Sequence, residues 1–148
     1  MKVLEVFNSQ RVMLELEAKN KKDVITRMAQ VLLEQGVISD KNAYVKSVLE
    51  RDEHSTTGVG NAIAIPHGKS EVVNEPAIIF AKLHHEVEWN ALDNKPVKIV
   101  VMLAIPNIAK GKVHLALLSE VAVKLMDDQL VNKLKEAKTE KCVVELLS

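Results

Sequence analysis

Two histidines of the sequence stand where their side chains could take part in chemistry. His67 follows a proline at the end of a short apolar segment, and His114 stands where helical periodicity begins. A neutral imidazole can act as a nucleophile at neutral pH, because its ordinary pKa is about 6.5. We therefore take His67 and His114 as the candidate reactive residues.

The surroundings of His67 predict that its side chain lies at the end of a strand. Pro66 donates no ladder hydrogen bond and Gly68 permits a sharp exit, so we expect the strand over 62–65 to end its ladder there. Ligand sites of α/β proteins gather at such strand ends. An inert histidine in a turn explains the same local residues equally well.

His114 has a weaker claim when it is taken alone. The start of a helix carries unpaired N–H groups and partial positive charge, which could hold an anion near His114. A capping or surface histidine is the simpler interpretation of the same position.

Motifs for other chemistries are missing from the sequence. No CxxC, HExxH or EF-hand spacing occurs, so we expect no metal site. There is no GxSxG nucleophile elbow and no P-loop, and Cys142 is more simply a packed small residue than a nucleophile. We therefore expect neither a metal nor a cofactor.

Composition and charge narrow the class of protein. The chain has 148 residues, 47% of them hydrophobic and 27% charged, which suits one domain over residues 1–148. Its 20 basic and 20 acidic residues cancel, which argues against a nucleic-acid binder or a membrane-surface protein. The longest apolar stretch, Ile99–Ile105, is far too short to span a bilayer, and the N-terminus lacks a signal-peptide pattern. With a single cysteine as well, we expect a cytoplasmic protein.

Strand and helix patterns indicate the frame that must hold these residues. Alternation over 11–18 predicts a strand, and the nearly continuous apolar runs 77–83 and 97–105 predict buried central strands. The predicted helices run from Asn20 to Gly36, from Ser39 or Asp40 to Glu53, from Leu115 to Leu125, over 129–138 and over 139–147. Helices on both sides of buried strands imply an α/β fold, a three-layer α/β/α sandwich.

The segment that contains His67 resembles a known family signature. It consists of Asp52, six further residues, and then Val59-Gly60-Asn61-Ala62-Ile63-Ala64-Ile65-Pro66-His67-Gly68. This ungapped segment resembles the phosphorylation-site signature of the enzyme IIA (EIIA) domains of the fructose and mannitol family, in the bacterial phosphoenolpyruvate-dependent sugar phosphotransferase system (PTS). Arg51 and His114 stand at positions similar to the family's active-site arginine and second histidine. Segments 89–97 and 114–119 also resemble the family, so the resemblance covers nearly the whole chain.

The resemblance implies a phosphocarrier that is phosphorylated on His67, at Nε2. It implies that Arg51 binds two phosphoryl oxygens and that His114 donates one hydrogen bond, which suits a reaction catalysed by positioning and charge. Gly60 and Asn61 are expected to shape the turn that faces the phosphoryl group. Without the family spacing, a surface salt bridge with a neighbouring acid, Asp52 or Glu53, would be the simpler interpretation of Arg51.

The implied partners are other PTS proteins. The phosphohistidine of HPr would be the donor, and a cysteine of EIIB the acceptor, with the membrane protein EIIC served indirectly. Because no EIIB-type cysteine loop or EIIC segment follows in the sequence, we expect EIIB on a separate chain. The family also implies a mixed central sheet flanked by helices on both faces. Ala62 stands where many relatives carry glycine, and we expect that change to leave the site undisturbed.

Other functions stay open alongside sugar transport. A regulatory EIIA of the nitrogen-related branch would share the site and signal by its phosphorylation state, although segment 89–97 is more similar to the sugar-transporting members. A binding module without catalysis would require Arg51, His67 and His114 to match the family spacing by chance. The sugar or polyol is selected largely by the membrane partner. An apolar face on the C-terminal helices could serve either a homo-oligomer or the EIIB interface.

Overall fold

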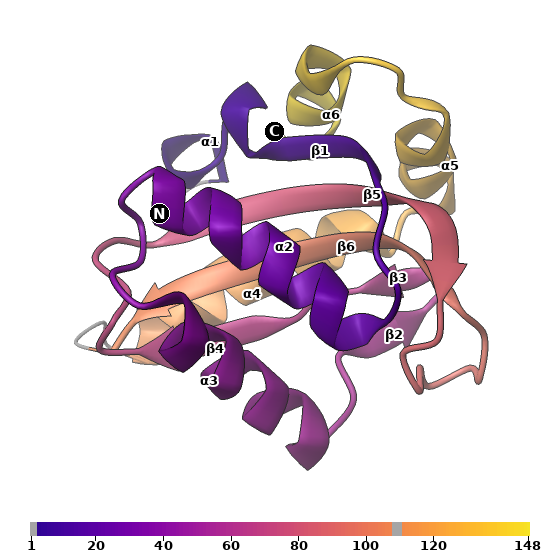
Figure 1. Ribbon diagram of the computed structural model, residues 1–148. Coiled ribbons are helices and arrows are strands. Elements are labelled where there is room, and N and C mark those ends of the chain that lie inside the picture. The colour runs from indigo at the N-terminus through magenta and orange to yellow at the C-terminus, as the bar shows by residue number, and fades with distance from the viewer. Residues whose placement is uncertain (1–2, 108–110) are drawn as a thin grey trace.

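A mixed sheet lies between two layers of helices (Figure 1). The computed structural model describes residues 3–107 and 111–148, and for residues 111–115 it describes the backbone alone. The helices are α1 (Val3–Val6), the short 3-10 helix η1 (Ser9–Arg11), α2 (Lys21–Glu34), α3 (Lys41–His54), α4 (Gly111–Leu125), α5 (Asp128–Glu136) and α6 (Glu140–Leu147). The strands are β1 (Val12–Leu16), β2 (Gly58–Gly60), β3 (Ile63–Ala64), β4 (His67–Ser70), β5 (Ala77–Val87) and β6 (Val97–Pro106).

The two long apolar runs form the centre of the sheet, as predicted. β5 and β6 pair antiparallel, with Phe80 opposite Val101. The strand order is β1-β5-β6-β3-β2, and β4 also pairs with β6. Because β1 is parallel to β5, and β3 and β4 are parallel to β6, the sheet is mixed. The predicted three-layer α/β/α sandwich with a mixed sheet is confirmed.

Each face of the sheet carries its own hydrophobic core. Side chains alternate along a strand, so Ile79 packs in the core beneath α2 and α3, while Ile78 and Phe80 pack in the core beneath α4, α5 and α6. Figure 1 shows α2 and α3 in front of the sheet and α4 behind it. This burial on both faces explains why β5 and β6 are nearly continuous apolar runs in the sequence.

Short polar signals determine where the first two long helices begin and end. The side chain of Asn20 accepts a hydrogen bond from the N–H of Asp23 at the start of α2, and Asp40 accepts one from Ala43 at the start of α3. Gly36 follows α2 with φ at 74°, a conformation that glycine adopts without strain. The predicted beginnings of both helices and the predicted end of α2 are therefore confirmed.

β1 departs from the predicted alternation at its last residue. The pattern places Val12, Leu14 and Leu16 on one face, and Val12 and Leu14 do pack in the core beneath α4. Leu16 packs instead in the opposite core, as does Met13. The pairing of β1 with β5 shifts register between Met13 and Leu16, and such an irregularity turns the later side chains to the other face.

The strand β3 ends before Pro66, as predicted, but pairing with β6 resumes at His67, so the prediction that the ladder ends there is wrong. Pro66 has no N–H to donate, but its carbonyl accepts a 3.0 Å hydrogen bond from the N–H of Leu103. Pairing with β6 therefore continues past the proline, and His67 begins β4 opposite Leu103. His67 consequently lies inside the sheet, at the junction of two short strands.

Candidate functional site

His67 is held with one ring nitrogen against the main chain. Its side chain is buried, and Nδ1 lies 3.1 Å from the carbonyl oxygen of Ile65. A carbonyl oxygen can only accept a hydrogen bond, so Nδ1 carries the proton of the neutral imidazole. Nε2 then carries the lone pair of the neutral ring.

A pocket of about 350 Å³ brings Arg51 and His67 together. α3 contributes Ser47, Glu50, Arg51 and His54 to its lining, and β4 contributes His67 and Lys69. The described lining thus contains two cationic residues, Arg51 and Lys69, and one acidic residue, Glu50. The arrangement suits the binding of an anion such as a phosphoryl group. His54 was not among the predicted site residues, because nothing local in the sequence connects the end of α3 with β4.

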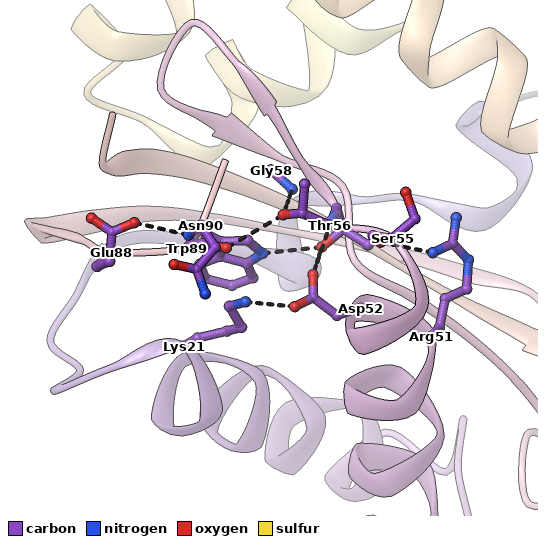
Figure 2. Close-up of polar contacts among 10 residues, drawn as sticks. Lys21, Arg51, Asp52, Ser55, Thr56, Gly58, Glu88, Trp89 and Asn90 are labelled. Atoms are coloured by element: carbon purple, nitrogen blue, oxygen red, sulfur yellow. Dashed lines mark hydrogen bonds and ion pairs between the residues drawn. The ribbon is translucent and has the colours of Figure 1, made fainter. Parts of the chain in front are cut away.

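The guanidinium of Arg51 is directed away from the neighbouring acid. Its Nη1 donates a 2.9 Å hydrogen bond to the carbonyl of Ser55, just beyond the end of α3 (Figure 2). A salt bridge with Asp52 is therefore the wrong interpretation of Arg51, since the carboxylate of Asp52 pairs with Lys21. A guanidinium has five N–H donors, so binding to Ser55 leaves donors that a phosphoryl group could use.

Close packing places α3 directly on β4, and this determines how near Arg51 comes to His67. A Cβ atom added to Gly68 would lie 2.6 Å from the Ser47 hydroxyl and 2.9 Å from a methyl group of Val48. Only glycine permits this approach of helix and strand. The central strand β6 is held to the same helix, because the Tyr44 hydroxyl donates a 2.9 Å hydrogen bond to the Leu103 carbonyl.

A buried polar network, which local sequence patterns do not reveal, lies at the end of α3 (Figure 2). One carboxylate oxygen of Asp52 lies 2.5 Å from Nζ of Lys21, and the other accepts hydrogen bonds from the N–H and the hydroxyl of Thr57 at 2.9 and 2.6 Å. The indole N–H of Trp89 donates to the same hydroxyl at 3.0 Å. The sequence offered one signal, since Asp52 is the first residue of the family signature, but Lys21 and Trp89 lie far from it in the chain.

The carboxyl of Asp52 is ionised in this network. Burial alone would raise its pKa, but the hydrogen bonds from Lys21 and Thr57 outweigh burial and hold the pKa below the ordinary value of 3.8. Nζ of Lys21 also lies 5.6 Å from the centroid of the fully buried Trp89 ring. The network therefore contains one paired negative charge, with hydrogen bonds to both of its oxygens.

Gly60 and Asn61 form a tight turn between β2 and β3. Three successive residues have positive φ, namely Gly60 at 97°, Asn61 at 56° and Ala62 at 64°. The turn is held by Asn61, whose N–H donates to Asp93 at 3.2 Å and whose side-chain amide donates to Asp128 at 3.1 Å. Gly60 and Asn61 line a different pocket, which they share with residues of α4 and whose described lining does not include His67. Their contact with a phosphoryl group therefore stays a prediction.

The predicted second histidine cannot be placed in the pocket from the described contacts. His114 belongs to the first turns of α4, but its side chain lies outside the described residues. Its predicted hydrogen bond to the phosphoryl group stays a prediction. Across 3–107 and 111–148, no group of three or more metal-binding side chains comes together, and none of the helices is long and apolar enough to cross a membrane.

Comparisons with known proteins agree with this geometry. A family model described as phosphoenolpyruvate-dependent sugar phosphotransferase system, EIIA 2, matches residues 5–148. The PTS system fructose-specific EIIABC component of Bacillus subtilis is 34% identical over 148 residues, which make up 100% of this chain and 23% of that protein. The PTS system fructose-specific EIIA component of Haloferax volcanii is 33% identical over 137 residues, which are 93% of this chain and 88% of that protein. The chain thus spans about a quarter of the first relative and most of the second.

The fold also matches a solved structure over almost its full length. The crystal structure of the nitrogen regulatory protein IIA-Ntr from Neisseria meningitidis has a TM-score of 0.89 and 25% sequence identity. The match covers 97% of this chain and 97% of that chain. The sheet and both helical layers therefore have a counterpart of known structure.

Proposed function

We propose that this chain, which belongs to the EIIA 2 family of the phosphoenolpyruvate-dependent sugar phosphotransferase system, carries a phosphoryl group on Nε2 of His67. The observation that carries the proposal is the hydrogen-bond geometry of the imidazole. With Nδ1 directed at the Ile65 carbonyl, the lone pair belongs to Nε2. The guanidinium of Arg51 lines the same pocket and supplies positive charge for the transferred group.

The first reaction is acceptance of the phosphoryl group from the phosphohistidine of HPr. The lone pair on Nε2 of His67 attacks phosphorus in line, the N–P bond to HPr breaks, and an N–P bond to His67 forms. The proton on Nδ1 stays in place, so the phosphorylated ring carries a positive charge. The Ile65 carbonyl accepts the hydrogen bond from Nδ1 and stabilises that charge.

The second reaction passes the group to a cysteine of EIIB. The thiolate attacks phosphorus, an S–P bond forms, and the N–P bond to His67 breaks. Because Nδ1 already carries a proton, His67 leaves as a neutral imidazole and regains the form that accepts the next group. Arg51 binds phosphoryl oxygens in both steps, and His114 donates a further hydrogen bond to them.

We propose a fructose-type sugar as the final acceptor and the cytoplasm as the place of action. The names of both relatives above support the sugar class, since each is a fructose-specific PTS component. The Bacillus subtilis relative joins EIIA, EIIB and EIIC in one protein, and the Haloferax volcanii relative is an EIIA component. EIIB would pass the phosphoryl group on to the sugar that EIIC moves, so EIIC would depend on this chain only indirectly.

Mass spectrometry of the intact protein tests this function. After incubation with phosphoenolpyruvate, enzyme I and HPr, we expect one phosphoryl adduct that is lost in acid, as phosphohistidine requires. His67→Ala should fold and acquire no adduct. A His67→Ala protein that is phosphorylated at the wild-type rate would refute the assignment of His67.

A regulatory role is the second candidate, and the likeness to the nitrogen regulatory protein of Neisseria meningitidis favours it. Such a protein would accept the phosphoryl group in the same way but would respond through its phosphorylation state. The two functions differ in the second reaction. Incubating the phosphorylated chain with a fructose-type EIIB should transfer the group to the EIIB cysteine in the transport role, whereas a regulatory protein would retain it.

A further inference from the structure

We infer that the network of Lys21, Asp52 and Thr57 holds the imidazole of His67 in its Nδ1-protonated form, which makes Asp52 and Thr57 positioning residues for phosphoryl transfer. The catalytic half of this inference rests on the proposed function. Its structural half concerns the unphosphorylated protein and is tested separately.

A continuous series of hydrogen bonds links the network to the imidazole. The carboxylate of Asp52 accepts from both the N–H and the hydroxyl of Thr57. The carbonyl of Thr57 accepts a 2.9 Å hydrogen bond from the N–H of Ile65. The carbonyl of Ile65 then faces Nδ1 of His67 at 3.1 Å. A change in the orientation of Thr57 would therefore alter the orientation of the carbonyl that faces Nδ1 of His67.

The Ile65 carbonyl is held from both sides along the chain. On one side the N–H of Ile65 binds Thr57, and on the other the carbonyl of Pro66 accepts from Leu103 of β6. A residue that precedes proline is restricted to extended conformations, which limits rotation of its carbonyl further. The Leu103 contact belongs to the pairing with β6, which substitutions at Thr57 or Asp52 do not alter directly. The hydrogen bond to Thr57 is therefore the contact of this segment that such substitutions change.

Burial restricts the conformations available to Asp52 and Thr57. Asp52 is 7% exposed and Thr57 is 3% exposed. Removing one member of a buried charged pair leaves the other without compensation, so alternative arrangements of Asp52 are strongly disfavoured. The hydroxyl of Thr57 accepts the indole N–H of Trp89, which fixes its direction from a third segment of the chain.

The same carboxylate also stabilises the end of the helix from which Arg51 extends. Asp52 and Thr57 join the last turn of α3 to the segment that follows it, and Arg51 donates to Ser55 within that segment. Figure 2 shows the two side chains leaving the end of α3 in different directions, Asp52 toward Lys21 and Arg51 away from it. One network thus supports both the imidazole and the guanidinium that face the pocket.

The test compares variants of matched shape. Thr57→Val removes the hydroxyl and keeps the size of the side chain, and Thr57→Ser keeps the hydroxyl as its control. Asp52→Asn removes the charge, and its control is Asp23→Asn, since Asp23 pairs with Arg27 at the surface of α2 and lies outside the network. Emission of Trp89, the single tryptophan of the chain, reports whether each variant keeps the packing around the indole.

Two measurements are made on each variant. The first is the ¹⁵N spectrum of the His67 ring in the unphosphorylated protein, which distinguishes a proton on Nδ1 from one on Nε2. The second is the rate of phosphoryl acceptance over a range of phospho-HPr concentrations, which separates the maximal rate from the half-saturating concentration.

For the wild type and both controls we expect a single Nδ1-protonated tautomer. For Thr57→Val and Asp52→Asn we expect a mixture of tautomers and a maximal rate lower by roughly 10- to 100-fold, because small displacements of a nucleophile are that costly. The half-saturating concentration of phospho-HPr should stay unchanged, because no docking residue is altered. Folded variants with the wild-type tautomer and the wild-type rate would overturn the inference.

A separate variant keeps the inference testable if Thr57→Val and Asp52→Asn fail to fold. Lys21→Met alters a partly exposed side chain at the start of α2 and removes the cation that pairs with Asp52, without changing Asp52 or Thr57 themselves. It should shift the tautomers of His67 in the same direction and lower the maximal rate by a smaller factor. A ¹⁵N spectrum of the ring identical to that of the wild type would overturn the inference. A wild type that accepts no phosphoryl group would refute the proposed function instead, while the ring spectra would still decide the structural half.

Discussion

The hydroxyl of Tyr44 donates a 2.9 Å hydrogen bond to the carbonyl of Leu103, the residue of β6 that pairs with His67. α3 and β4 are therefore both aligned on one residue of the central sheet. Arg51 lies two helical turns after Tyr44, so this alignment also determines where the guanidinium meets the imidazole.

Tyr44→Phe should lower the stability of the protein. The change leaves the Leu103 carbonyl without the buried hydroxyl that now donates to it, a loss of about 1–2 kcal/mol in the free energy of unfolding. Urea unfolding followed by circular dichroism measures it. The ring is retained, so packing is preserved, and an unchanged unfolding midpoint would show that the hydrogen bond contributes nothing.

Gly68→Ala should separate α3 from β4. The added methyl group would meet the Ser47 hydroxyl at 2.6 Å and Val48 at 2.9 Å, and overpacking of this kind destabilises by about 1–3 kcal/mol. We also expect slower phosphoryl acceptance, because Arg51 moves with the helix. Adding Ser47→Ala removes one of the two clashes, so the double variant should recover part of the stability, and failure to recover any would argue against this contact as the cause.

Ala62→Gly should stabilise the protein, and the expectation that alanine at this position leaves the site undisturbed concerns phosphoryl transfer alone. Ala62 has φ at 64°, where a Cβ atom costs about 1–2 kcal/mol, and the greater freedom of glycine in the unfolded chain offsets part of the gain. We expect a net gain of about 0.5–1 kcal/mol in thermal or urea unfolding. Ala43→Gly in α3 is the control and should lose stability, because its backbone is helical. A loss of stability in Ala62→Gly would contradict the assignment of strain.

Asp52 should make stability depend on pH in the acid range. Its pKa in the folded protein is held below 3.8 by Lys21 and Thr57 despite burial, so the unfolded carboxyl binds a proton first as the pH falls. The stabilisation is complete above the ordinary pKa and is lost as the pH falls through the folded pKa. Asp52→Asn should therefore be less stable than the wild type at pH 7, with a difference that shrinks below about pH 4. Unfolding free energies measured from pH 7 to pH 3 test this, and a constant difference would contradict it.

His114→Ala should separate acceptance of the phosphoryl group from its later transfer. If His114 donates a hydrogen bond to the phosphoryl oxygens, the variant should still be phosphorylated on His67 but should transfer the group to EIIB slowly or lose it sooner to water. Adduct lifetime and transfer rate, followed by mass spectrometry, measure both. Unchanged values for both would remove His114 from the site.

Local patterns in the sequence were sufficient to predict where the first two long helices begin and which segments form the central strands. A cap such as Asn20 or Asp40 binds an N–H three residues away, so its effect is contained in a few neighbouring residues. The apolar runs of β5 and β6 required burial on both faces, whatever covered them. His67 was also a candidate on local grounds, through the family signature that contains it, and Arg51 lines the same pocket, as its spacing from His67 suggested.

Only the tertiary structure decided how the site is held. The sequence could not assign the tautomer of His67, because the answer lies in the orientation of the Ile65 carbonyl. Nor could it pair Lys21 with Asp52, since the two come from different helices whose separation is determined by packing on the sheet. Register is equally non-local, and a shift in the pairing of β1 moved Leu16 to the opposite core. Residue types determined which chemistry is available, whereas the backbone conformation at Ile65 and contacts between distant segments determined how those residues are held.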